Sequence, residues 1–208
     1  FCPYNGYNKE LIGEWNRRLP GHVTTLEYWF CEASGIPQIR GPGSVAVWQE
    51  RMRWQKHEID SPGLSSFIGP DSERRYGVMP IRAEWDANPV ARWLATRVMW
   101  NPDQDIEALK GFYYTRAYRE AAKTMAEYHA LQGRMTHDDS IRPKGRTMLN
   151  SNERDRLDAL LVKALGEVKH PTAKTLIQRQ YDHWMLVKKS SGAETVSHVS
   201  KDEPHREV

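Results

Sequence analysis

Apolar and polar positions follow two different patterns along this chain. In the first half, short β-branched and aromatic runs alternate with segments whose apolar residues recur at helical spacing. These runs predict strands at residues 22–30 and 64–68, and the helical spacing predicts helices at residues 44–59 and 86–100. Strands and helices that alternate through short loops are typical of a parallel α/β sheet or barrel.

The second half carries only helical patterns. Caps, prolines at helix starts and apolar residues at three- and four-residue spacing predict further helices. Their expected positions are residues 102–114, 116–131, 151–168 and 171–189. We expect Asn101 to be the N-cap of the first of these helices.

These patterns divide the chain into three regions. Residues 1–100 read as strand–helix units, residues 101–189 as a helical extension, and residues 190–208 as a disordered tail rich in Ser, His and charge. Two strands alone do not make a stable sheet. Because the chain begins at Phe1 rather than Met, we expect the remainder of its own N-terminal chain to supply the missing strands.

Composition excludes some classes of function. The mean hydropathy is −0.75, and no apolar run approaches the roughly 18 residues of a membrane span, so no span is expected. The net charge is +3 with scattered basic residues, which argues against a nucleic-acid surface. There is no short catalytic motif and no zinc spacing around Cys2 and Cys31. Because His137-Asp138-Asp139 reads as a solvated loop, no metal or cofactor is expected.

The candidate sugar-binding residues lie after the two predicted strands. Glu27, Tyr28 and Trp29 end the first strand, and Glu73 and Tyr76 follow the second. Ligands of parallel sheets bind at the carboxyl ends of strands, and a carboxylate between aromatic rings suits a sugar. Glu27 is also the one weak candidate for a catalytic acid. The alternative is that Glu27 only points outward while its neighbours pack.

Tryptophan is concentrated in the first half, which holds seven of the eight residues. Trp48, Trp54 and Trp93 lie at helical spacing among apolar neighbours, so we expect them to pack inside the protein. Trp100 precedes Asn101, and we expect a buried ring there as well.

Residues 91–131 resemble the C-terminal part of a bacterial glycoside-hydrolase-like domain of unknown function. That domain is similar to alpha-glucuronidase and endo-beta-N-acetylglucosaminidase barrels. Its mark is a helix that ends in Trp-Asn-Pro-Asp, then a second acid, then a tyrosine and a double alanine. The matching residues are Val98, Met99, Trp100, Asn101, Pro102, Asp103, Asp105, Leu109, Tyr118, Ala121 and Ala122. Looser matches lie at Trp15, at Leu26-Glu27-Tyr28 and from Gly63 to Ile68, whereas an acid of the family falls at Gly69.

The resemblance implies the last strand–helix units of a TIM-like (β/α) barrel, followed by a helical extension. It also implies the C-terminal part of an exported or periplasmic protein that acts on a glycan, with its catalytic residues further upstream. One alternative is a non-catalytic carbohydrate-binding or scaffold protein with a barrel fold, which the departure at Gly69 favours. Another is a self-contained helical interaction module at residues 101–189.

Overall fold

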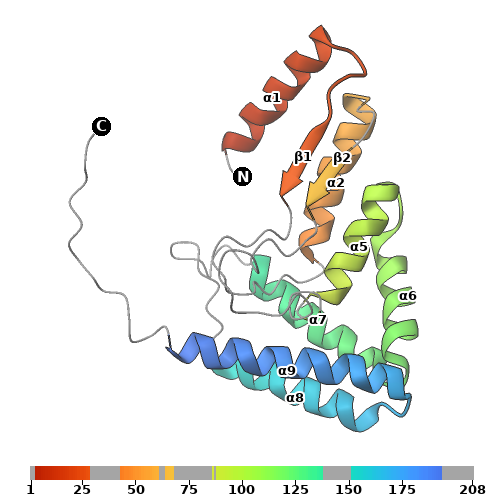
Figure 1. Ribbon diagram of the computed structural model, residues 1–208, viewed down its shortest axis with the longest axis vertical. Coiled ribbons are helices and arrows are strands. Elements are labelled where there is room, and N and C mark those ends of the chain that lie inside the picture. Colours follow the sequence, from red (N-terminus) through yellow and green to blue (C-terminus); the bar gives the residue numbers. More distant parts are fainter. Residues whose placement is uncertain are drawn as a thin grey trace, which may run out of the picture.

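The computed structural model describes residues 3–28, 43–60, 64–67, 86, 88–137 and 151–193. Within these ranges the chain is predominantly helical (Figure 1). The elements in chain order are α1 (Pro3–Arg18), β1 (Thr25–Tyr28), α2 (Gly43–Glu58), β2 (Leu64–Phe67), α5 (Pro89–Trp100), α6 (Ile106–Tyr118), the short 3-10 helix η1 (Arg119–Ala121), α7 (Ala122–His137), α8 (Ser151–Glu167) and α9 (Pro171–Ala193).

The prediction of a TIM-like barrel is wrong for the part of the chain that the structure describes. The sheet there consists of β1 and β2 alone, which pair in parallel from Thr25↔Leu64 to Tyr28↔Phe67. In a barrel, the helix between two strands packs on the strands. Here α2 lies between β1 and β2 in sequence, but it packs on α5 and α7. The described fold is therefore helical, with one small strand pair.

The hydrophobic core joins helices from both halves of the chain. Its buried side chains come from α2, α5, α6, η1, α7, α8 and α9, together with Val168 after α8. Val45, Trp48 and Met52 of α2 belong to the same cluster as Leu157 and Leu161 of α8. One core therefore runs across the expected boundary at residue 100, and a module of residues 101–189 would lose the α2 and α5 part of it.

A hairpin of α8 and α9 closes the lower side of this core (Figure 1). Pro171 is the first residue of α9, as the sequence predicts, and Leu157, Leu161 and Ala164 are fully buried along α8. Trp184 of α9 donates from its indole nitrogen to Asp158 of α8. Lys188 binds the other oxygen of the same carboxylate, so that one acid ties the two helices together.

A chain of buried polar side chains fixes the packing of α6, α7 and α9. His129 Nδ1 donates to Gln132 Oε1 at 2.8 Å, so His129 Nε2 accepts from the Tyr118 hydroxyl at 2.9 Å. Gln180 Nε2 in turn donates to the Tyr118 oxygen at 3.0 Å. Burial lowers the pKa of His129 to about 4 and raises that of Tyr118, so both groups are neutral near neutral pH. Each side chain in this series donates to the next, from Gln180 through Tyr118 and His129 to Gln132. This order of donors and acceptors favours a single arrangement of the three helices.

Three expectations about local structure need correction. The helix after the Asn-Pro-Asp sequence begins at Ile106 and not at Pro102, because its N-cap is Asp105, whereas Asn101 ends α5. The helix α1 was not expected, and its apolar side chains Leu11 and Trp15 are about half exposed. The ring of Trp100 is 90% exposed, so the prediction of a buried ring is wrong.

Candidate functional site

The loop between α5 and α6 forms several hydrogen bonds within itself and with the helices beside it. Asp105 Oδ1 accepts from the backbone N–H groups of Glu107 and Ala108, at 2.8 and 3.1 Å, and so caps α6. Gln104 Nε2 donates back to the carbonyls that end α5, at 2.7 Å to Arg97 and 3.0 Å to Asn101. The loop therefore satisfies exposed backbone groups of both helices that it joins.

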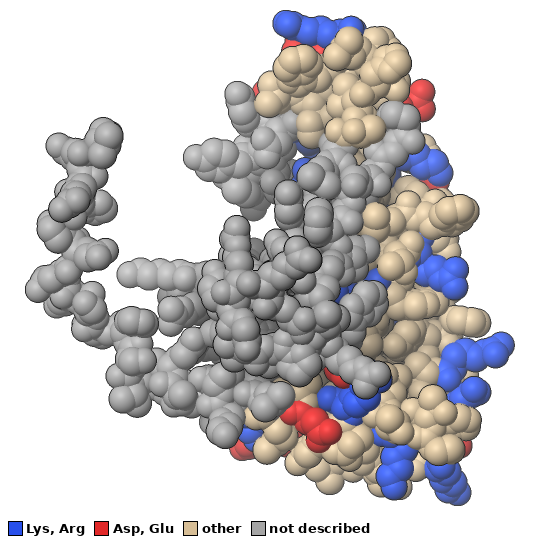
Figure 2. Space-filling model, in the orientation of Figure 1, with Lys and Arg blue, Asp and Glu red and all other residues tan. Residues whose placement is uncertain are grey.

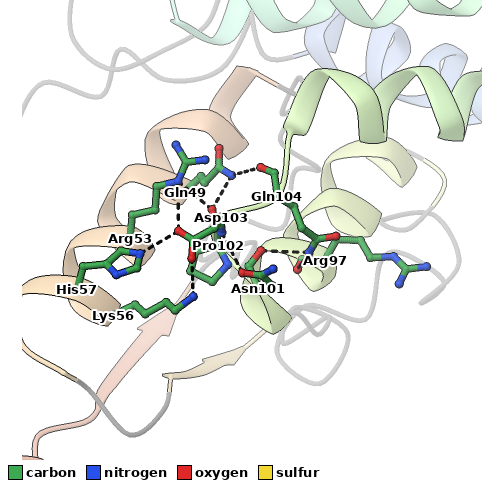
Figure 3. Close-up of polar contacts among 9 residues, drawn as sticks. All are labelled: Gln49, Arg53, Lys56, His57, Arg97, Asn101, Pro102, Asp103 and Gln104. Carbon is green, nitrogen blue, oxygen red and sulfur yellow. Dashed lines mark hydrogen bonds and ion pairs between the residues drawn. The ribbon is translucent and has the colours of Figure 1, made fainter.

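One face of α2 holds this loop from the side (Figure 3). Gln49 Nε2 donates to the carbonyl oxygens of Pro102 and Gln104 at 2.7 and 2.6 Å. Arg53, one turn further along α2, donates to the Pro102 carbonyl at 3.0 Å. Residues four apart share a face of a helix, so this pair reaches the same loop.

The next turn of α2 supplies two further side-chain partners to Asp103. Lys56 and His57 each bind one oxygen of its carboxylate, the latter at 2.9 Å, and Arg53 Nε lies 3.8 Å from it. The hydrogen bonds from His57 and then from Lys56 lower the pKa of Asp103 to about 2. Asp103 therefore stays ionised at all ordinary pH values.

This arrangement is poorly suited to acid–base catalysis. A depression of about 420 Å³ lies beside the loop, and its lining includes the carboxylates of Asp103, Asp105 and Glu107. Glycoside hydrolysis needs a carboxyl group whose pKa is raised, so that it can give a proton to the leaving oxygen. The pKa of Asp103 is lowered, Asp105 caps α6, and Glu107 pairs with Lys110 at 2.6 Å. These three carboxylates therefore hold the loop and the start of α6 in place.

The structure describes only part of the predicted sugar site. Glu27 and Tyr28 lie at the carboxyl end of β1, opposite Ser66 and Phe67 of β2. Trp29, Glu73 and Tyr76 lie outside the described residues, as do Asp138 and Asp139. The prediction that these residues bind a sugar therefore stays a prediction. No group of three His, Cys, Asp or Glu side chains is placed to hold a metal in the ranges that the structure describes.

The outer face of α5 and α6 carries aromatic side chains. Trp93 packs against the edge of the core, as the sequence predicts, whereas Trp100 does not. Trp93 is only partly buried and stacks on Phe112 of α6, with ring centroids 6.1 Å apart. Trp100 lies seven residues after Trp93 and is almost fully exposed. A spacing of seven residues places both rings on one helix face, so the sequence contained the signal. Trp100 stays outside the core because the opposite face of α5 packs there, with Val90, Leu94 and Val98 fully buried.

A substitution at Gln49 tests whether the hydrogen bonds from α2 to the α5–α6 loop stabilise the protein. We expect Gln49→Leu to lower the free energy of unfolding by about 1–3 kcal/mol. The Gln104 carbonyl loses its donor from α2, and the Pro102 carbonyl keeps only Arg53 as a donor from the described residues. Gln55→Leu, on the same helix, is the matched control. Gln55 is equally buried (3% exposed, against 6% for Gln49), but neither atom of its amide has a partner among the described residues. That control is expected to be neutral or stabilising in urea unfolding, and equal losses in both variants would contradict the role of Gln49.

No helix in the described ranges is long and apolar enough to cross a membrane, which agrees with the sequence-based expectation. Comparison of the chain with protein-family models, curated proteins and solved structures gives no match.

Proposed function

We propose that this chain belongs to a protein that binds glycans, and that its helices form a non-catalytic scaffold within that protein. The observation that supports a scaffold is that several carboxylates bind side chains or backbone groups of a neighbouring helix or loop. Asp103 joins the α5–α6 loop to α2, Asp158 joins α8 to α9, and Asp86 accepts from Arg179 of α9 at 2.9 Å. Glu120 of η1 accepts from the Lys169 backbone N–H at 3.0 Å, just before α9 begins. Carboxylates that form such contacts between helices stabilise a helical assembly.

The choice of a glycan rests on the resemblance to a glycoside-hydrolase-like domain. The marker sequence of that resemblance, from Trp100 to Asp105, is the loop that α2 holds. Exposed aromatic rings on α5 and α6 add support, because flat rings cover the apolar face of a pyranose. The alternative is a catalytic part of a glycoside hydrolase, with Glu27 as the candidate acid. The carboxylates around the α5–α6 loop do not favour it, since the pKa of Asp103 is lowered, Asp105 caps α6 and Glu107 pairs with Lys110.

Glycan binding and glycan hydrolysis can be separated in one set of measurements. We expect the purified chain to be retarded in native gels that contain a polysaccharide and to release no reducing sugar from the same polysaccharides. A gel without polysaccharide is the control for mobility. Release of reducing ends would reject the non-catalytic role, whereas unchanged mobility across a broad panel of glycans would reject the glycan itself.

A further inference from the structure

A strip of aromatic and arginine side chains crosses the outer face of α5 and α6. We call it the aromatic–arginine strip, and its members are Trp93, Arg97, Trp100, Phe112 and Arg116. The rings of Trp93 and Phe112 stack at an interplanar angle of 15°. The Arg97 guanidinium lies 5.1 Å from the Trp93 ring centre, and that of Arg116 lies 5.4 Å from the Phe112 ring centre. Each helix thus contributes an aromatic ring with a cation over it.

Trp93 packs against the core, but the other two rings of the strip are not needed to fill it. Trp100 is 90% exposed and Phe112 is 52% exposed, although large aromatic side chains are mostly buried in folded proteins. On α5, Trp93, Arg97 and Trp100 follow one another at spacings of four and three residues, so they share a face about 10 Å long. Clustered exposed aromatic residues on a folded protein mark a surface that binds something.

The two guanidinium groups keep their hydrogen-bond donors available. Neither Arg97 nor Arg116 forms an ion pair with an acid in the described part of the chain. Glu107, an acid of the same helix as Arg116, is engaged by Lys110. Lys and Arg side chains project along the edge of the molecule where α5 and α6 lie (Figure 2). The strip therefore combines flat apolar surfaces with unpaired positive charge.

We propose that the aromatic–arginine strip binds an anionic polysaccharide, one whose sugar rings carry carboxylate groups. The apolar face of a sugar ring would stack on Trp100, the most exposed ring of the strip. The carboxylates of the chain would accept from the forks of Arg97 and Arg116, whose paired N–H groups match a carboxylate. This site lies on different elements from the predicted site at Glu27, and it rests on the proposed function only for the choice of a sugar as ligand.

A single-stranded nucleic acid would also stack on aromatic rings beside arginines. The polysaccharide is favoured because the net charge of the whole chain is only +3, whereas nucleic-acid surfaces are usually strongly basic. The nucleic acid is therefore kept as an outcome of the test.

The test compares variants of the full chain by retardation in native gels with polygalacturonate, with neutral hydroxyethyl cellulose, or with poly(U) as the competitor. We expect Trp100→Ala to weaken binding to polygalacturonate by about tenfold, as for a central aromatic contact. We expect the double variant R97Q/R116Q to bind polygalacturonate more weakly than the parent does. Any binding to the neutral polymer should decrease less. Because all three residues are exposed, thermal melts of these variants should match that of the parent.

Two control variants lie outside the strip. Val162→Ala removes an exposed apolar side chain of α8, and Lys174→Gln removes an exposed charge of α9. Both should bind polygalacturonate like the parent, and an equal loss in Lys174→Gln would show attraction by overall charge and reject the strip. Parent-like binding of Trp100→Ala and R97Q/R116Q would also reject it, as would poly(U) displacing polygalacturonate with the same dependence on the variants. Binding to the neutral polymer alone would overturn this inference and leave the proposed function standing, whereas binding to no glycan would overturn both.

Discussion

Acidification from about pH 7 to about pH 5 is expected to lower the free energy of unfolding by about 4 kcal/mol, roughly 2 kcal/mol from each of two buried histidines. Burial lowers the pKa of His129 and of His183 from 6.5 to about 4. Between these values the unfolded chain binds more protons than the folded one. The stability that the neutral histidines confer is therefore complete above about pH 6.5 and is lost as the pH falls toward about 4. Urea unfolding at a series of pH values measures this loss.

His183 allows its own share to be isolated. Neither of its ring nitrogens has a hydrogen-bond partner among the described residues, so the apolar His183→Leu removes a desolvated polar group without breaking a bond. We expect this variant to match or exceed the parent near pH 7 and to exceed it by about 2 kcal/mol near pH 5. An unchanged pH dependence in His183→Leu would mean that this ring is not kept neutral by burial.

Trp184→Ala is expected to lower the free energy of unfolding by about 3–5 kcal/mol, which is a large part of the total for a domain of this size. Trp184 is only 1% exposed and is among the largest fully buried side chains. Its removal leaves a cavity in the core and deprives Asp158 of the indole donor, so that among the described residues only Lys188 still binds this carboxylate. The difference in urea unfolding free energy at neutral pH measures the effect.

Two further variants separate the causes. Trp184→Phe keeps most of the buried ring but loses the N–H group, so about 1–2 kcal/mol should be lost. Trp100→Ala removes the same side chain from an exposed position and should change stability by about 0.5 kcal/mol or less. A large loss in Trp100→Ala would show that this ring supports the fold, and it would remove the basis for a binding role.

Only part of the candidate site could be predicted from local sequence patterns. The sequence predicts a cap at Asn101 and a buried ring at Trp100, but Asp105 is the residue that caps α6 and the Trp100 ring is exposed. The partners of Asp103 lie 46 and 47 residues upstream, on α2. No local spacing links Lys56 and His57 to this loop, because their approach depends on how α2 packs against α5.

By itself, the sequence determined most of the helices and the positions of the two strands. The prediction that Trp48 packs inside the protein is confirmed, because helical periodicity shows which side of a helix avoids water. Only the tertiary structure decided that α2 packs on other helices, that the described strands stop at a single pair, and that the Trp100 ring stays outside. A strand pattern reports that a segment is extended but not how many strands lie beside it, and an amphipathic pattern does not name its partner. Those outcomes depend on contacts between residues far apart in sequence, which local patterns do not contain.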